Sequence, residues 1–161
     1  MIIFDTDILS IFAKIDRLEL IKKLFGTIYI CPMIKEEFIV TLEYGYKFSL
    51  DILNNTTVII PTEKELSAYT ELRMKVGKGE AEAISIAKSR KLSFATNDKV
   101  AQKVAKENGV GIISLLAILK ALLEKRILSQ DELIQVIKDI RLKDNLIIPD
   151  DEIGKILTEN R

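Results

Sequence analysis

Residues 1–12, MIIFDTDILSIF, join a short apolar run to an acid and then to a helical pattern. The run Met1–Phe4 has the length and composition of a buried strand. Ile8 and Ile11 stand three residues apart, the spacing of one helix face, so a helix is predicted after the strand. Asp5 lies at the junction between the two. The stretch predicts an α/β fold that carries a carboxylate at the end of its first strand.

The same strand-then-helix pattern recurs along the chain. Further apolar, β-branched runs are Ile28–Ile30, Val58–Ile60, Leu92–Ala95 and Gly111–Ile113, each followed by a segment of helical periodicity. This alternation is typical of a mainly parallel β-sheet, here of about five strands, flanked by helices. Residues 45–57 are less regular and are compatible with one more helix.

Beyond Ser114 the pattern is helical alone. Ser129 and Glu132 form a capping box that predicts the start of one helix, and a short last helix is predicted around Ile153–Leu157. The length of 161 residues suits one domain. We expect a single domain over residues 1–161, with an α/β core at 1–125 and a helical C-terminal extension at 126–161.

The composition excludes several classes of protein and of site. Lys and Arg number 24, as do Asp and Glu, so no global positive field attracts nucleic acid. The chain has no histidine, which excludes Ser-His-Asp triads, Cys-His nucleophiles and His-based zinc sites. Any catalysis must therefore use carboxylates, Lys, Tyr, Ser or Thr.

The compartment follows from the cysteine count and the apolar runs. Cys31 is the only cysteine, so no intramolecular disulfide forms. The N-terminus lacks the basic and apolar regions of a signal peptide. The longest apolar stretch, Val110–Leu123, is shorter than the roughly 20 residues that span a bilayer. We expect a cytoplasmic protein without a membrane segment.

Four acids stand at the ends of predicted elements. Asp5 and Asp98 directly follow strands, and the carboxyl ends of parallel strands share one edge of the sheet. Glu80 lies in the first turn of a helix, on its buried face, and Glu37 lies on the apolar side of the helix that begins at Pro32. Each acid has an alternative explanation as a helix cap or as a favourable charge at a helix N-terminus.

Two neighbouring acids are assigned to other roles. Asp7 immediately precedes an apolar helical run and is the better N-cap candidate of the first motif. Glu82 falls on a different helical face from Glu80, together with Ser85 and Ile86, and is expected to matter little.

A cluster of carboxylates predicts bound cations. Acids held close together repel one another and resist common ionisation unless positive charge compensates. Mg²⁺ and Mn²⁺ prefer oxygen ligands, and Mg²⁺ completes its shell with phosphate oxygens. Phosphodiester hydrolysis assisted by metal ions needs no histidine base.

The motifs resemble those of PIN-domain nucleases, which include the toxins of VapBC-type toxin–antitoxin pairs. The matching stretches are FDTDILS at residues 4–10, PMIKEEF at 32–38, GEAEAISIA at 79–87 and ATND at 95–98. The C-terminal stretches LLAILKALLEKRILSQDELIQVIKDI and LIIPDDEIGKIL are similar to a PIN subfamily with a helical tail.

The resemblance implies a site and an activity. The catalytic, metal-binding acids would be Asp5, Glu37, Glu80 and Asp98, supported by Thr6, Asp7 and Asn97. The cofactor would be Mg²⁺ or Mn²⁺, and the substrate single-stranded RNA. We expect a metal-dependent endoribonuclease, the toxin of a pair with a small DNA-binding antitoxin. The alternatives are a non-catalytic RNA-binding or regulatory PIN-like module and an RNA-processing nuclease outside any such pair.

Candidate binding surfaces are less specific. Basic residues that precede Glu80 or follow Asp98 form two strips that could bind RNA, among them Arg73, Lys78, Lys99 and Lys103. Ordinary solvated helix faces explain them as well. Apolar residues between Phe38 and Leu53 predict a homodimer or antitoxin surface, or else core packing. A response-regulator-like domain would need a Lys after the last strand, and GIISLL has none.

Overall fold

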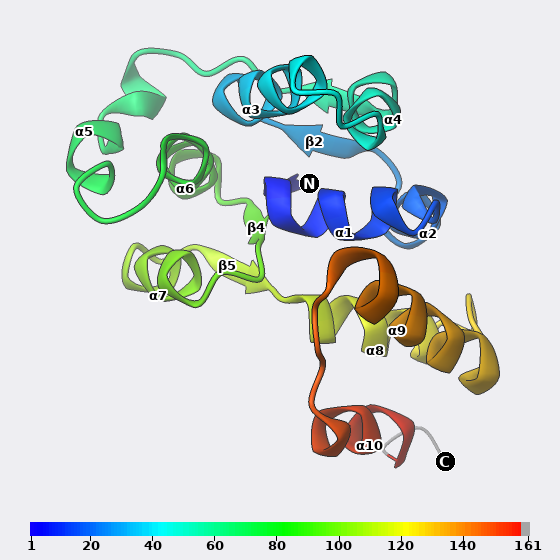
Figure 1. The fold of residues 1–161 in the computed structure, drawn as a ribbon. Coiled ribbons are helices and arrows are strands. Elements are labelled where there is room, and N and C mark those ends of the chain that lie inside the picture. The colour runs from blue at the N-terminus through cyan, green and yellow to red at the C-terminus, as the bar shows by residue number, and fades with distance from the viewer. Residues whose placement is uncertain (159–161) are drawn as a thin grey trace.

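The computed structural model describes residues 1–158 and contains one parallel sheet among helices (Figure 1). The strands are β1 (Ile2–Phe4), β2 (Ile28–Ile30), β3 (Thr56–Val58), β4 (Ser93–Ala95) and β5 (Gly111–Ile113). The helices are α1 (Thr6–Lys14), α2 (Leu18–Phe25), α3 (Pro32–Glu43), α4 (Phe48–Asn55), the short 3-10 turn η1 (Lys64–Leu66), α5 (Tyr69–Leu72), α6 (Lys78–Arg90), α7 (Lys99–Glu107), α8 (Leu115–Glu124), α9 (Gln130–Asp144) and α10 (Asp150–Thr158). The predicted five-stranded α/β fold with a helical C-terminal region is confirmed.

The strand order fixes where a site can form. The order is β3-β2-β1-β4-β5, so the chain first builds the sheet on one side of β1 and then crosses to the other side. β1 pairs in parallel with β4 in the register Phe4 to Ala95. Ligands of open parallel sheets bind at the carboxyl ends of the strands where the order reverses. That point lies between β1 and β4.

Helix α6 is buried against the sheet because its side chains are small. It contacts both β1 and β4, and Ala81, Ala83, Ile84 and Ala87 are fully buried. Alanine leaves room for close approach of helix and strands and has the highest helix propensity. The close packing sets the position of Glu80, which directly precedes this buried stretch.

The C-terminal helices pack onto the core rather than extending from it. Helix α9 contacts α1 and α8, and α10 contacts α8. The capping box predicted at Ser129 and Glu132 is present, with the Ser129 hydroxyl accepting from the Glu132 amide at 3.2 Å. Figure 1 shows these three helices together at one side of the molecule. Residues 159–161 of the predicted extension lie outside the described residues.

The third strand lies two residues earlier than the sequence predicted. Helix α4 occupies most of the irregular segment and ends at Asn55, so the extended backbone begins at Thr56. Thr56–Val58 pairs with Ile28–Ile30, and the Ile59 amide still donates to the Ile30 carbonyl at 2.8 Å. Pairing does not continue to Ile60, where apolar composition alone had placed the strand.

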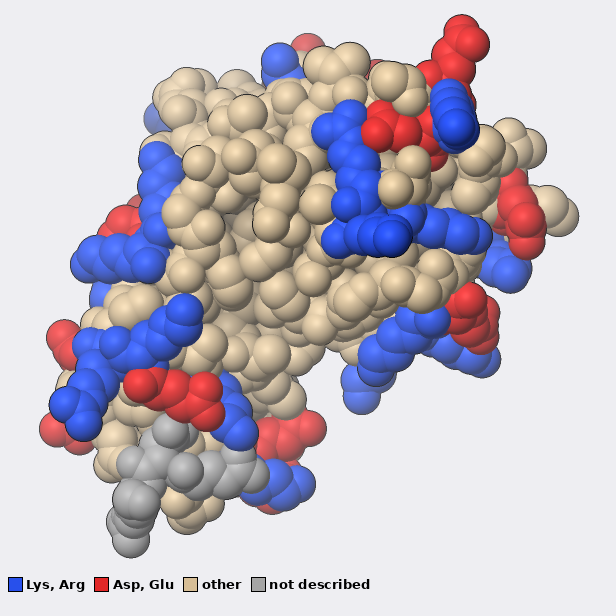
Figure 2. Space-filling model, turned by 180° about the vertical axis from the view of Figure 1, so that it is seen from behind, with Lys and Arg blue, Asp and Glu red and all other residues tan. Residues whose placement is uncertain are grey.

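The surface carries mixed charges. Figure 2 shows, on the face turned away in Figure 1, basic and acidic side chains in separate small groups around a broad area without charge. None of the helices in residues 1–158 combines the length and the apolar character required to cross a bilayer.

Candidate active site

Asp5 lies at the junction of β1 and α1, where the strand order reverses. Its amide donates to the Ala95 carbonyl of β4 at 2.9 Å, which continues the pairing of the two strands. Its Oδ1 accepts from the Thr6 amide at 2.8 Å, and its Oδ2 accepts from the Thr96 hydroxyl at 2.7 Å. The residue is 2% exposed. The fold thus holds a buried carboxylate in a fixed orientation.

The charge of Asp5 is unfavourable where it stands. Burial, followed by the charges of Asp7 and Glu80, raises the pKa of Asp5 from 3.8 to about 8, although hydrogen bonds from Thr96 and Thr6 oppose the rise. Two acids thus lie near enough to Asp5 to oppose its ionisation. Such a group gains strongly from a nearby cation.

Asp7 links α1 to the loop that follows β4. The expectation that Asp7 caps α1 is wrong, because the N-cap is Asp5 and Asp7 lies inside the first turn. Its Oδ1 accepts from the Ile8 amide at 2.6 Å, and its Oδ2 accepts from the Asn97 amide at 2.8 Å. Burial raises its pKa, and the charge of Asp98 adds to the rise. A position assigned to capping is therefore part of the acidic cluster.

Asp98 and Glu80 are helix caps and also face the cluster. Asp98 is the N-cap of α7, and its Oδ1 accepts from the Ala101 amide at 2.8 Å. Glu80 accepts from the Gly77 amide through Oε2 at 2.9 Å. Burial raises the pKa of Glu80, and the charges of Asp98, Asp7 and Glu37 contribute. For both residues, capping a helix is thus compatible with a position in the acidic cluster.

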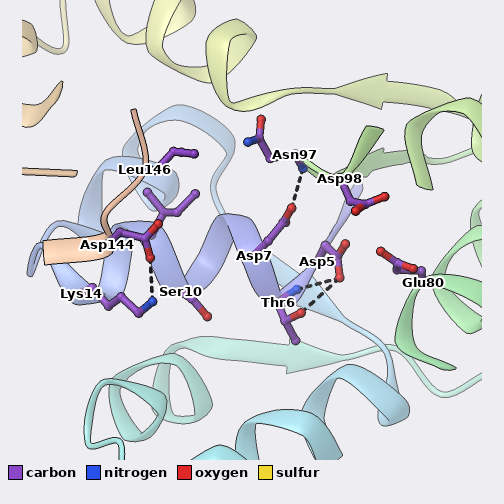
Figure 3. Close-up of a pocket in the computed structure, with 11 residues that line it drawn as sticks. Asp5, Thr6, Asp7, Ser10, Lys14, Glu80, Asn97, Asp98, Asp144 and Leu146 are labelled. Atoms are coloured by element: carbon purple, nitrogen blue, oxygen red, sulfur yellow. Dashed lines mark hydrogen bonds and ion pairs between the residues drawn. The ribbon is translucent and has the colours of Figure 1, made fainter. Parts of the chain in front are cut away.

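These acids line one pocket of about 500 Å³. Figure 3 shows the carboxylates of Asp5, Glu80 and Asp98 on the same side of α1, with Lys14 at the opposite end of that helix. The pocket is lined by Asp5, Thr6, Asp7, Ser10, Ile11, Lys14, Glu80, Asn97, Asp98, Asp144 and Leu146.

Glu37 borders this pocket without lining it. Its Oε1 lies 2.7 Å from the position that a Cβ on Gly79 would occupy, so Gly79 provides the space for this carboxylate. Burial raises its pKa, while hydrogen bonds from the Thr6 hydroxyl and the Gly79 backbone lower it. Glu37 thus sits beside Thr6 and close enough to Glu80 to affect the pKa of Glu80. Three of the four predicted acids line the pocket, and the fourth adjoins it.

Glu82, expected to matter little, has a structural role, while its lack of a role in catalysis stays a prediction. Glu82 is 4% exposed, and its Oε2 accepts from the Met33 amide at 2.7 Å. It thus satisfies a free amide at the start of α3, the helix that carries Glu37. Helix α6 is buried on nearly all sides, and it packs against α3 as well as against the sheet. Glu36, by contrast, is exposed.

The candidate RNA-binding side chains differ in their environments. Lys78, Lys99 and Lys103 are exposed at or near the starts of α6 and α7, the helices that carry Glu80 and Asp98. Arg73 is half-buried and donates from its guanidinium to the Val76 carbonyl at 2.8 Å. The structure gives Arg73 a local structural role, and RNA binding by the three lysines stays a prediction.

Sequence reasoning missed several residues of the pocket. Thr96 is fully buried and orients Asp5, and a polar residue directly after a buried strand was an available signal. Lys14 and Asp144 form an ion pair of 2.6 Å in the pocket wall. They are 130 residues apart, and no local pattern connects them.

The donor set fits a hard divalent cation. Among residues 1–158, no Lys or Arg pairs with Asp5, Asp7, Glu37, Glu80 or Asp98, although four of these acids have raised pKa values. All the donors are oxygens, as Mg²⁺ and Mn²⁺ require. Among these described residues, no group of three or more Asp, Glu or Cys side chains is arranged so that it could hold a metal ion.

Comparison with known proteins agrees with this geometry. A family model described as the PIN domain matches residues 1–160. PIN domains are generally nucleases and usually use divalent metal ions. No curated protein matches the sequence. Since the match covers nearly the whole chain, including every residue of the acidic pocket, this chain belongs to the PIN-domain family.

Proposed function

We propose that this chain is an endoribonuclease that hydrolyses phosphodiester bonds of single-stranded RNA with Mg²⁺ or Mn²⁺. The observation that carries the proposal is the pocket between β1 and β4, where Asp5, Asp7, Glu80 and Asp98 gather without a cationic partner in the described part of the chain. Asp5, Glu80 and Asp98 would hold the cation, and Glu37 would serve the same site from its position beside Thr6. Asp98 is exposed and Glu80 only half-buried, so both side chains have room to turn toward Asp5.

The chain's own residues prepare this site for phosphate chemistry. When bound, a divalent cation stabilises negative charge on phosphate oxygens and makes water a stronger nucleophile at neutral pH. Thr96 and Thr6 hold the Asp5 carboxylate in one orientation. Asp7 fixes the loop that carries Asp98 through the Asn97 amide. The acids also repel the RNA backbone unless a cation is present, so binding and hydrolysis both depend on the metal.

Cleavage of labelled single-stranded RNA tests the proposal. Wild-type protein should cut it with Mg²⁺ or Mn²⁺ and stop with EDTA. Asp5→Asn should lose at least about a hundredfold in rate, because an amide is a far weaker metal ligand than a carboxylate. Glu36→Gln is the matched control, since Glu36 is exposed and should retain full activity. Full metal-dependent activity in Asp5→Asn would show that the acids are assigned wrongly.

We further propose that the nuclease is the toxin of a VapBC-type pair. Support comes from the resemblance of its four motifs to those of PIN-domain nucleases, which include the toxins of such pairs. Its C-terminal helices are also similar to a PIN subfamily with a helical tail. Induced expression should arrest bacterial growth, Asp5→Asn should not, and a small DNA-binding protein encoded next to the gene should relieve the arrest. Normal growth despite active enzyme would favour an RNA-processing role instead.

We also propose that a second copy of the chain covers the exposed side of α3 and α4. Phe38 and Ile52, within the predicted surface segment, are buried in the chain's own core. The exposed apolar residues of the two helices and their connection are Ile39, Val40, Tyr44, Tyr46 and Leu50. Interface cores are rich in aromatic residues, and two of these exposed residues are tyrosines.

Light scattering at several protein concentrations tests the homodimer. Leu50→Lys should shift the protein to a monomer, because a charge would be buried at the interface. Leu142→Lys is the control, since Leu142 is exposed on α9, outside α3 and α4. A wild-type protein that stays monomeric at high concentration would rule out this interface.

A further inference from the structure

Lys14 is a cationic side chain at the end of the acidic pocket opposite Asp5, Glu80 and Asp98. Of the described residues that line the pocket, Lys14 alone carries a positive charge. Ser10, Ile11 and Lys14 follow Asp7 by three, four and seven residues, so all four share one face of α1. This face forms the floor of the pocket, with Asp7 toward the acids and Lys14 at the far end (Figure 3).

Lys14 is held in place by contacts from two other helices. Its Nζ lies 2.6 Å from Oδ1 of Asp144, at the end of α9, and 5.3 Å from the centre of the Phe48 ring in α4. The Lys14 side chain keeps one third of its surface exposed. An ammonium group has three donors, so the bond to Asp144 leaves others to face the pocket. The side chain is thus ordered and still accessible.

The ion pair is not required merely to attach α9 to α1. The neighbouring pair Lys143 to Asp16, at 3.2 Å, joins the same two helix ends on the outside of the molecule. Ile140 of α9 is fully buried as well. The difference between the two pairs is their location, because Lys14 and Asp144 line the pocket, whereas Lys143 and Asp16 do not.

We propose that Lys14 binds a second backbone phosphate of a single-stranded RNA lying along α1, and that Asp144 positions Lys14 for this contact. The inference rests on the proposed nuclease function, because the acids would receive the phosphate that is cleaved. Seven residues separate Asp7 from Lys14, about 10 Å along the helix axis. The two ends of the pocket are thus far enough apart to engage different phosphates of one strand. The C-terminal helix α9 supplies part of the binding site through Asp144.

The first test compares substrates of two lengths by initial rates. Lys14→Gln should lower kcat/KM for a ten-nucleotide RNA by about tenfold, the effect of losing one charge-assisted contact, mainly through KM. It should leave a ribodinucleoside monophosphate unaffected, because that substrate has one phosphate only. Lys14→Arg should restore kcat/KM for the ten-nucleotide RNA. Asp144→Asn should raise KM with a smaller change in kcat.

Lys143→Gln is the matched control, since it breaks the other α1–α9 ion pair without changing the pocket. It should behave as wild type with both substrates. Equal losses of kcat/KM in Lys14→Gln and Lys143→Gln would show that the Lys14–Asp144 pair only links α1 to α9, and would overturn the inference. So would equal losses on the long and the short substrate.

A binding measurement separates this inference from the proposed function. Fluorescence anisotropy follows binding of the labelled ten-nucleotide RNA with Ca²⁺, which also takes oxygen ligands. Lys14→Gln should bind about tenfold more weakly than wild type, and the slope of log affinity against log salt should fall by about one. If wild type cleaves no RNA yet shows this difference, the nuclease proposal fails and the phosphate site stands. If wild type cleaves RNA and Lys14→Gln binds it equally well, the phosphate site is wrong.

Discussion

At the scale of single residues, the central feature is the charge of Asp5. Its carboxylate is almost fully buried and accepts three hydrogen bonds, yet its pKa is raised to about 8 by burial and by neighbouring acids. Thr96 counteracts this rise, because its hydroxyl donates to the ionised carboxylate. The balance between the two effects sets the pH at which Asp5 ionises, and under the proposed function this is the pH at which Asp5 becomes a metal ligand.

We therefore expect Thr96→Val to shift the pH dependence of metal-dependent cleavage to higher pH. Valine keeps the shape of threonine but donates no hydrogen bond, so the pKa of Asp5 rises further. The variant should also lose about 1–3 kcal/mol in free energy of unfolding at neutral pH, because a buried acceptor loses its partner. Rate profiles between pH 6 and 9 check the shift. Thr96→Ser, which keeps the hydroxyl, should match wild type, and an unchanged Thr96→Val profile would disprove the role of this bond.

At the scale of elements, the sequence predicted which strand ends meet but not how the helices pack. Asp5 and Asp98 were expected at one sheet edge because parallel strands share their carboxyl ends, and the pairing of β1 with β4 confirms it. Periodicity assigned Glu82 to an outer face, which presumes a helix with one buried side. Helix α6 packs against the sheet, α3 and α5, so it has no such free face at Glu82.

The buried position of Glu82 yields a prediction at this scale. Glu82→Ala should lower the free energy of unfolding by about 1–2 kcal/mol, because the Met33 amide at the start of α3 loses its acceptor. Urea denaturation measures the change. Glu36→Ala, on the exposed side of α3, should change it by less than about 0.5 kcal/mol. Equal stability of both variants would show that the contact to Met33 contributes nothing.

At the scale of the whole molecule, the pocket depends on segments that are far apart in the chain. Lys14 and Asp144 meet because α9 folds back onto α1. The sequence predicted α9 as a helix from its capping box and periodicity, but neither signal says which partner a helix packs against. The same long-range packing buries several acids near one another and makes the stability of the metal-free protein depend on pH.

The direction of this pH dependence follows from the raised pKa values. The unfolded chain releases the Asp5 proton near pH 3.8, whereas the folded protein keeps it until about pH 8. Between these values the folded state binds more protons, so its stability falls as the pH rises. Asp7, Glu37 and Glu80 act in the same direction. In EDTA, the melting temperature should be highest near pH 4–5 and fall toward pH 8.

Asp5→Asn isolates the contribution of one acid. The variant should show a shallower decline and exceed wild type by about 1–3 kcal/mol in free energy of unfolding at pH 7.5 in EDTA, because its amide takes up no proton on folding. Thermal unfolding monitored by circular dichroism across this pH range checks both expectations. A wild-type protein that becomes more stable between pH 5 and 8 would contradict the raised pKa values.

The location of bound Mn²⁺ is the most direct test of the proposal that a divalent cation binds in the pocket between β1 and β4. Crystals grown with Mn²⁺ should give an anomalous difference peak in contact with the carboxylates of Asp5, Glu80 and Asp98. Oxygen ligands of a hard divalent cation lie roughly 2.0–2.6 Å away. The peak should be absent from Asp5→Asn crystals and present in Glu36→Gln crystals. Mn²⁺ bound only elsewhere, with the pocket acids still in their capping positions, would contradict a cation site formed by Asp5, Glu80 and Asp98.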